Sequence, residues 1–187
     1  MTQSNTSHIM HKHIILLLAT LALSPFVVLA AEPPADFVEQ ISALTSGRTG
    51  TPMKLKKDEA ATTKAKFKPP VEIEIVAKTD STNLRASYAA DQIIFNWESA
   101  KNEFRVNGGP ANGKHKFGAG LIPTNKYVTI RWRVTPKKQS IQVDGNLRFE
   151  HSGDYSNIDN AVSVFSAQGS EVTVKSIKVK QLPLGTE

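Results

Sequence analysis

Apolar and polar residues alternate along much of the chain, which is the pattern of strands that bury one face and expose the other. The clearest run is YVTIRWRV at 127–134, where every second residue is apolar, and Pro136 then ends the strand. Apolar positions resume on either side of Asp144-Gly145, a dipeptide suited to the positive φ angles of a type I′ turn. The pattern therefore predicts three successive strands between 127 and 149, the last two forming a hairpin.

The same alternation predicts strands near 71–79, 84–88, 93–97, 104–106, 162–164 and 172–179. In the last of these the apolar parity shifts by one residue, which predicts a β-bulge near Lys175-Ser176. A single short helix is predicted at 37–44. Roughly nine to eleven short strands favour an all-β fold, a two-sheet antiparallel jelly-roll sandwich with a short N-terminal helix or extended segment.

The first thirty residues differ from the rest of the chain. Lys12 precedes an apolar run at 14–23, and VLA at 28–30 has small residues where a signal peptidase cuts. A retained anchor is the alternative, but Ser24-Pro25 interrupts the ~20 apolar residues that a membrane span needs. We therefore expect a signal peptide at 1–30, export to the periplasm, cell surface or medium, and no integral membrane span after cleavage.

Residues 31–69 are expected to form an N-terminal extension, with the short helix and a lysine-rich segment, and residues 70–187 the sandwich. The lysine-rich segment has six lysines from 54 to 68. Such a cluster could contact an anionic polymer or lipid, but lysines also protect an exposed edge strand from pairing with another chain. Export argues against a nucleic-acid partner. The chain has no cysteine, so it has no disulfide or thiolate metal site.

Several segments carry a resemblance to a known family. They are EIEIVAKTD at 72–80, IIFNWE at 93–98, NKYVTIRWRV at 125–134, IQVDGN at 141–146 and VTVKSIKVKQL at 172–182. The chain resembles the concanavalin A-like lectin/glucanase jelly roll, and is similar to exported keto-disaccharide hydrolase and laminin-G-like domains. The resemblance implies a fold that sugar-binding modules and glycoside hydrolases share, so it supports a carbohydrate ligand only by analogy.

The acidic residues depart from the catalytic members of that superfamily. Jelly-roll glucanases carry Glu-x-Asp-x-x-Glu on one strand, whereas this chain has Glu72, Glu74 and then Ala77. The carboxyl pair that a retaining hydrolysis requires is incomplete. We therefore predict no catalytic residue, and a small glycosidase-like enzyme of the keto-disaccharide hydrolase type, with Glu98 or Asp154 as its acid, is the alternative.

Polar and aromatic side chains on the outward faces of the predicted strands and in one loop are the candidate ligand-binding residues. Arginine forks match carboxylates and sulfates, and exposed tyrosines can stack on sugar rings. Trp97 and Trp132 instead share the parity of the core. The candidates are Arg85, Asn96, Glu98, Arg105, Tyr127, Arg131, Arg133 and Tyr155.

These candidates predict a non-catalytic carbohydrate-binding or surface-interaction module, with anionic glycans as one class of ligand. Cross-strand Arg–Glu pairs and solvation would explain the same residues without a ligand. A protein partner and a structural role in the cell envelope are therefore further alternatives.

No metal or cofactor is predicted. The loop at 154–160 offers oxygen donors that calcium would accept, but the same residue types are typical of ordinary turns. His115 and His151 each lack a second histidine at ligand spacing.

Overall fold

The computed structural model describes residues 38–39, 50–57 and 59–186. The predicted signal peptide at 1–30 lies outside the described residues, as does most of the predicted helix at 37–44. The two described residues of that segment, Val38–Glu39, form strand β1 instead. No helix in the described ranges is long and apolar enough to cross a membrane.

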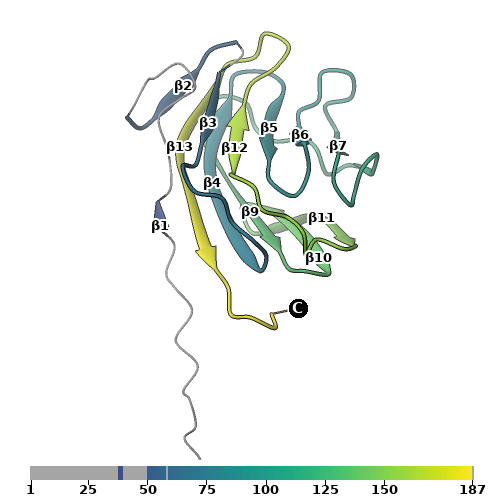
Figure 1. Ribbon diagram of the computed structural model, residues 1–187. Coiled ribbons are helices and arrows are strands. Elements are labelled where there is room, and N and C mark those ends of the chain that lie inside the picture. The colour runs from purple at the N-terminus through teal and green to yellow at the C-terminus, as the bar shows by residue number, and fades with distance from the viewer. Residues whose placement is uncertain (1–37, 40–49, 58, 187) are drawn as a thin grey trace, which may run out of the picture. The chain divides into compact units, whose positions relative to one another are not determined.

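Two antiparallel sheets make up the described part of the chain, which confirms the predicted all-β sandwich (Figure 1). The seven-stranded sheet has the order β1-β13-β4-β9-β10-β11, and β2 also pairs with β13. Its strands are β1, β2 (Met53–Leu55), β4 (Val71–Thr79), β9 (Val128–Val134), β10 (Lys138–Val143), β11 (Asn146–Ser152) and β13 (Val172–Gln181).

The six-stranded sheet has the order β3-β12-β5-β6-β7-β8. Its strands are β3 (Ala60–Thr62), β5 (Leu84–Ser87), β6 (Gln92–Phe95), β7 (Glu103–Asn107), β8 (His115–Phe117) and β12 (Ser163–Phe165). Strands β2 and β3 arise within the lysine-rich segment, so the two sheets include strands that precede residue 70.

The alternation in the sequence sets the register of the central strands. In β4 every second residue from Val71 to Thr79 is buried, and on β9 Trp132 stands opposite Ile73. The predicted hairpin is confirmed, because Asp144 and Gly145 have φ angles of 48° and 80° between β10 and β11. The predicted bulge is also confirmed, because the β13–β4 register shifts between Val174 and Ser176.

The hydrophobic core lies between the two sheets. Phe104 of the six-stranded sheet has its ring centroid 5.1 Å from Phe149 of the seven-stranded sheet and 5.1 Å from Phe95. Trp132 is fully buried and meets the edge of Tyr88 at 90°, with 6.1 Å between ring centroids. Each such buried side chain contributes about 1.5–3 kcal/mol, so burial between the sheets holds this cysteine-free chain together.

Candidate functional site

The structure divides the eight predicted ligand-binding residues between the two outer faces of the sandwich and its interior. We call the outer surface of the six-stranded sheet the six-stranded face. It comprises Arg85, Gln92, Ile94, Arg105 and Asn107, together with Trp97 and Glu98 from the loop that follows β6. The seven-stranded face is the outer surface of the other sheet, and comprises Glu72, Glu74, Lys78, Arg131, Arg133, Lys138, Ser140, Glu150, Lys178 and Lys180.

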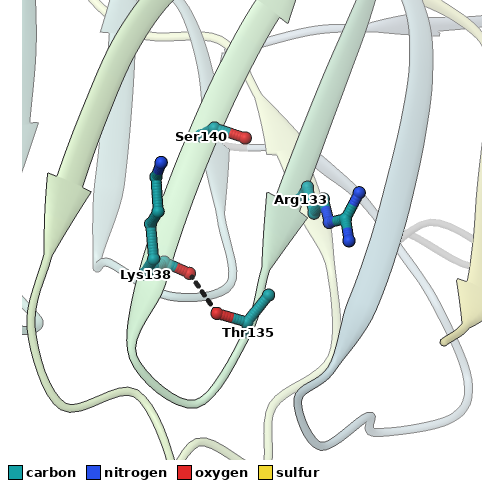
Figure 2. A pocket seen from close by; sticks show the side chains of 4 residues that line it. All are labelled: Arg133, Thr135, Lys138 and Ser140. Carbon is teal, nitrogen blue, oxygen red and sulfur yellow. Dashed lines mark hydrogen bonds between the residues drawn. The ribbon is translucent and has the colours of Figure 1, made fainter. Parts of the chain in front are cut away.

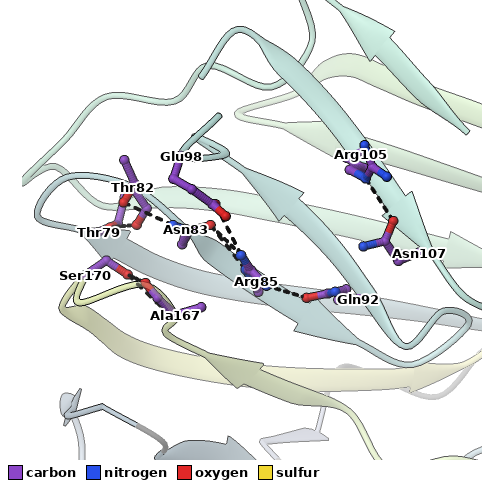
Figure 3. Close-up of polar contacts among 10 residues, drawn as sticks. All are labelled: Thr79, Thr82, Asn83, Arg85, Gln92, Glu98, Arg105, Asn107, Ala167 and Ser170. Carbon is purple, nitrogen blue, oxygen red and sulfur yellow. Dashed lines mark hydrogen bonds and ion pairs between the residues drawn. The ribbon is translucent and has the colours of Figure 1, made fainter. Parts of the chain in front are cut away.

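On the six-stranded face, Arg85 is held by its neighbours. Its Nε and Nη2 atoms donate to Oδ1 of Asn83 at 3.2 and 2.8 Å, and Nη1 donates to Oε1 of Gln92 at 2.8 Å (Figure 3). Its Nη2 also lies 3.3 Å from Oε2 of Glu98. The Arg85 side chain is only 12% exposed. These contacts fix the direction of its guanidinium group before any ligand arrives.

A second arginine lies across the same face. Arg105 donates from Nε to Oδ1 of Asn107 at 2.9 Å (Figure 3). Its Cζ atom lies 4.6 Å from the ring centroid of Trp97. Ile94 stands between the two arginines in register, opposite Arg85 on one side and Arg105 on the other. It is 1% exposed yet lies outside the core cluster, so side chains of this face cover it.

The predicted positions of Trp97 and Asn96 are exchanged. Asn96 has a φ angle of 48°, and this left-handed backbone breaks the alternation at the end of β6. The Asn96 side chain is therefore buried, where Oδ1 accepts from the Ile122 N–H at 2.9 Å and Nδ2 donates to the Ile122 carbonyl at 3.0 Å. Asn96 thus anchors a loop, which corrects its assignment to the polar face. Trp97, predicted in the core, is only half-buried.

Tyr155 is a second correction. Its side chain is fully buried, although it was predicted as an exposed loop residue. Its hydroxyl is 2.8 Å from Nδ1 of His151, and its N–H donates to the Pro136 carbonyl at 2.8 Å. The loop turns inward because this large ring completes the end of the core. Burial raises the pKa of Tyr155 to about 12.

The seven-stranded face holds Arg131 and Arg133. Arg131 donates from Nη2 and Nε to Oε2 of Glu74 at 3.1 and 3.3 Å, so a residue of the incomplete glucanase pattern forms a cross-strand ion pair. Tyr127 precedes this strand, is half-buried, and has Nζ of Lys78 at 5.2 Å from its ring centroid.

The candidate acids of the enzyme alternative are also engaged. Glu98 pairs with Arg85. The N–H and hydroxyl of Ser156 donate to Oδ1 of Asp154 at 3.0 and 2.6 Å, and these hydrogen bonds lower the pKa of Asp154. A lowered pKa disfavours proton donation near neutral pH. Within the ranges that the structure describes, no group of three or more His, Asp or Glu side chains is placed to hold a metal ion.

Four residues of the six-stranded face and its supporting network were absent from the sequence-based candidates: Asn83, Gln92, Trp97 and Asn107. The sequence does carry a signal for one of them. Asn107 follows Arg105 by two residues, and residues two apart on a strand share a face. Asn83 lies just before β5 and has a φ angle of 52°, so strand alternation does not place it. Gln92 is different, because only the β5–β6 pairing brings it to Arg85.

Comparison with known proteins bears on the fold. No family model matches the sequence, and no curated protein matches it. Among solved structures, the exoplasmic/lumenal domain of VIP36, in a form bound to Ca²⁺ and Man3GlcNAc, matches with a TM-score of 0.56 at 10% identity, over 81% of this chain and 85% of that domain.

Two further matches are enzymes by their names. The β-glucanase of Bacillus licheniformis has a TM-score of 0.51 at 10% identity, over 70% of this chain and 78% of that enzyme. A β-agarase A in complex with oligoagarose has a TM-score of 0.50 at 12% identity, over 72% of this chain and 74% of that enzyme. The chain therefore has the concanavalin A-like lectin/glucanase jelly-roll fold, as its resemblance implied. Identities this low establish the fold and leave the function to the site.

Proposed function

We propose that this chain is an exported carbohydrate-binding module, and that the glycan binds on the six-stranded face. The observation that carries the proposal is the fixed pair of arginines on this face, of which Arg105 contacts Trp97. Arg85 and Arg105 are each held by side-chain amides of nearby residues, so their remaining N–H groups point in set directions. A pre-arranged site loses little conformational entropy when a ligand binds.

The chemical composition of this face suits a sugar. Trp97 offers an aromatic surface on which the apolar side of a pyranose ring can stack, and its indole already contacts a cation. Glu98 supplies an acceptor for hydroxyl groups, while Arg105 supplies donors. The fold supports the same proposal, because lectins and glycoside hydrolases share it.

A glycan array probed with the purified protein and three variants tests this proposal. Trp97→Ala and Arg105→Gln should abolish or strongly weaken binding to the glycans that the unmodified protein retains. Arg131→Gln is the matched control, since it removes the same charge from the opposite side of the sandwich. Running the array at low and physiological salt would show whether charged sugars are preferred, because salt screens arginine contacts.

Two results would overturn the proposal. The first is an array with no bound glycan at either salt concentration. The second is binding that survives Trp97→Ala and Arg105→Gln but is lost in Arg131→Gln, which would move the site to the seven-stranded face.

A further inference from the structure

The seven-stranded face contains a polar pocket that the proposed glycan site does not use. The pocket has a volume of about 200 Å³ and lies where β9 turns into β10 (Figure 2). It is lined by Arg133, Thr135, Lys138 and Ser140. All four side chains can donate hydrogen bonds, two of them are cations, and none is a carboxylate.

The turn between the strands fixes the pocket wall. The Thr135 N–H donates to the Lys138 carbonyl at 2.8 Å, and the Thr135 hydroxyl reaches the same carbonyl at 3.3 Å. Ser140 stands opposite Arg133 in the β9–β10 register. Figure 2 shows the Ser140 hydroxyl between the side chains of Lys138 and Arg133. Donors of three kinds thus line one pocket on this hairpin.

Arg133 differs from the other arginines that have been described. It forms no hydrogen bond or ion pair with any residue in the described part of the chain, although Glu72 lies opposite it in register. Arg131, two residues earlier on the same strand, is bonded to Glu74. The guanidinium of Arg133 therefore has donors available for a ligand.

Lys138 can also turn to a ligand. Its Nζ atom is 2.7 Å from Oε2 of Glu150, but the two side chains are 42% and 46% exposed. An ion pair this exposed is weak, so an anion in the pocket can compete with Glu150 for the ammonium group.

The surrounding charge favours anions. Cations outnumber anions on the seven-stranded face: Lys78, Arg131, Arg133, Lys138, Lys178 and Lys180 stand against Glu72, Glu74 and Glu150. An excess of one sign over a surface raises the local concentration of oppositely charged ligands.

We propose that this pocket binds a tetrahedral oxyanion, a sulfate or a phosphate group. The fork of Arg133, the ammonium of Lys138 and the hydroxyl of Ser140 line the pocket, and a tetrahedral anion has enough acceptor oxygens to bond all three when the flexible arginine and lysine side chains turn to it. The volume is several times the ~30 Å³ of a water molecule and admits the anion with part of its hydration. This pocket is independent of the six-stranded face, so each proposal can fail alone.

Titration of the full chain with sodium sulfate, and separately with sodium phosphate, tests the proposal by NMR at constant ionic strength. The backbone amides of 133–140 should shift and saturate. Arg133→Gln should weaken the affinity at least about tenfold, since it removes the bidentate donor. Arg131→Gln, the matched control on the same strand, should change it less than about twofold. Glu150→Gln should strengthen it about two- to threefold by removing a competitor for Lys138.

A sulfated dextran oligosaccharide, titrated next, distinguishes the sources of the anion. Binding at least about tenfold tighter than inorganic sulfate would identify a sulfated polysaccharide as the ligand, because neighbouring cations would contact further groups. Equal affinity would identify the free ion. Shifts that do not saturate, or equal losses in Arg131→Gln and Arg133→Gln, would overturn the proposal, since general charge screening would then explain the response.

Discussion

Arginines on the two outer faces of this sandwich are in opposite states. On the six-stranded face, Arg85 is 12% exposed and bonded to three different side chains. On the seven-stranded face, Arg131 is 52% exposed and bonded to Glu74 alone, and Arg133 has no partner among the described residues. One face is therefore organised before a ligand binds, whereas the other has exposed ion pairs and an arginine, Arg133, that is available to a ligand.

This difference arises from the residues that lie two positions before or after each arginine in the sequence. Asn107 places its amide oxygen beside Arg105 on the same strand, and Asn83, which immediately precedes β5, does the same for Arg85. In contrast, Arg131 and Arg133 stand beside each other on β9, so each depends on a neighbouring strand for a partner. An outward-facing arginine is therefore part of a fixed site in the six-stranded sheet, whereas in the seven-stranded sheet it is part of an exposed charged surface.

The largest expected effect is on stability. Arg85→Met should lower the free energy of unfolding by about 2 kcal/mol, because it leaves the Asn83 and Gln92 oxygens without their donor. Arg131→Met, which breaks one exposed pair, should cost less than about 0.5 kcal/mol. Urea denaturation of both variants would measure the difference, and equal losses would contradict the contrast between the faces.

The next effect concerns glycan binding. Trp97→Ala should weaken the affinity for an array-positive glycan roughly tenfold, because an aromatic stacking contact contributes about 1.5 kcal/mol. Tyr127→Ala is the matched control, since its ring lies beside Lys78 rather than on the six-stranded face. Isothermal titration would measure both, and a larger loss for Tyr127→Ala would place the sugar elsewhere.

Alkaline pH should test the core separately from the arginines of both faces, because arginines stay charged there while burial opposes the ionisation of core tyrosines. The pKa of Tyr155 is raised from 10 to about 12, so its contribution to stability is complete below pH 10 and is lost as the pH rises through 12. The expected loss is about 1 kcal/mol between pH 10 and 11.

Tyr155→Phe should make that part of the pH dependence shallower, as measured by thermal unfolding from pH 8 to 11. Burial also raises the pKa of Tyr88, which hydrogen-bonds to the Phe67 carbonyl at 3.1 Å. Some alkaline sensitivity should therefore remain in the variant. An unchanged slope in Tyr155→Phe would show that its hydroxyl is not protected by burial.

The smallest effect is expected at the rim of the oxyanion pocket. Lys138→Gln and Glu150→Gln should each change the free energy of unfolding by less than about 0.5 kcal/mol, because their ion pair is exposed. A double-mutant cycle in urea would measure the coupling. A coupling energy above about 1 kcal/mol would mean that Lys138 is committed to Glu150 and unavailable to an anion.

The fold could be predicted largely from periodicity, since the residues at 127–134 alternate cleanly, the parity shift within 172–179 marks the bulge, and Asp144-Gly145 specifies its turn. The site could be predicted only in part. A single positive φ angle at Asn96 exchanged the environments of Asn96 and Trp97, and alternation alone cannot show where it will break. The sequence also cannot show which strands are neighbours, and this decided that Arg85 and Arg131 would lie on different sheets.

Two short strands from early in the chain share one edge of β13: β1 pairs with Lys178 and Val179, and β2 pairs with residues from Val172 to Val174. Trimming the chain before residue 56, by a protease for example, would strip both from a strand of 10 residues. The bared edge would be a template for a second copy of the protein. Strands β1 and β2 thus cover part of this edge, and their loss should appear as aggregation before any loss of ligand binding.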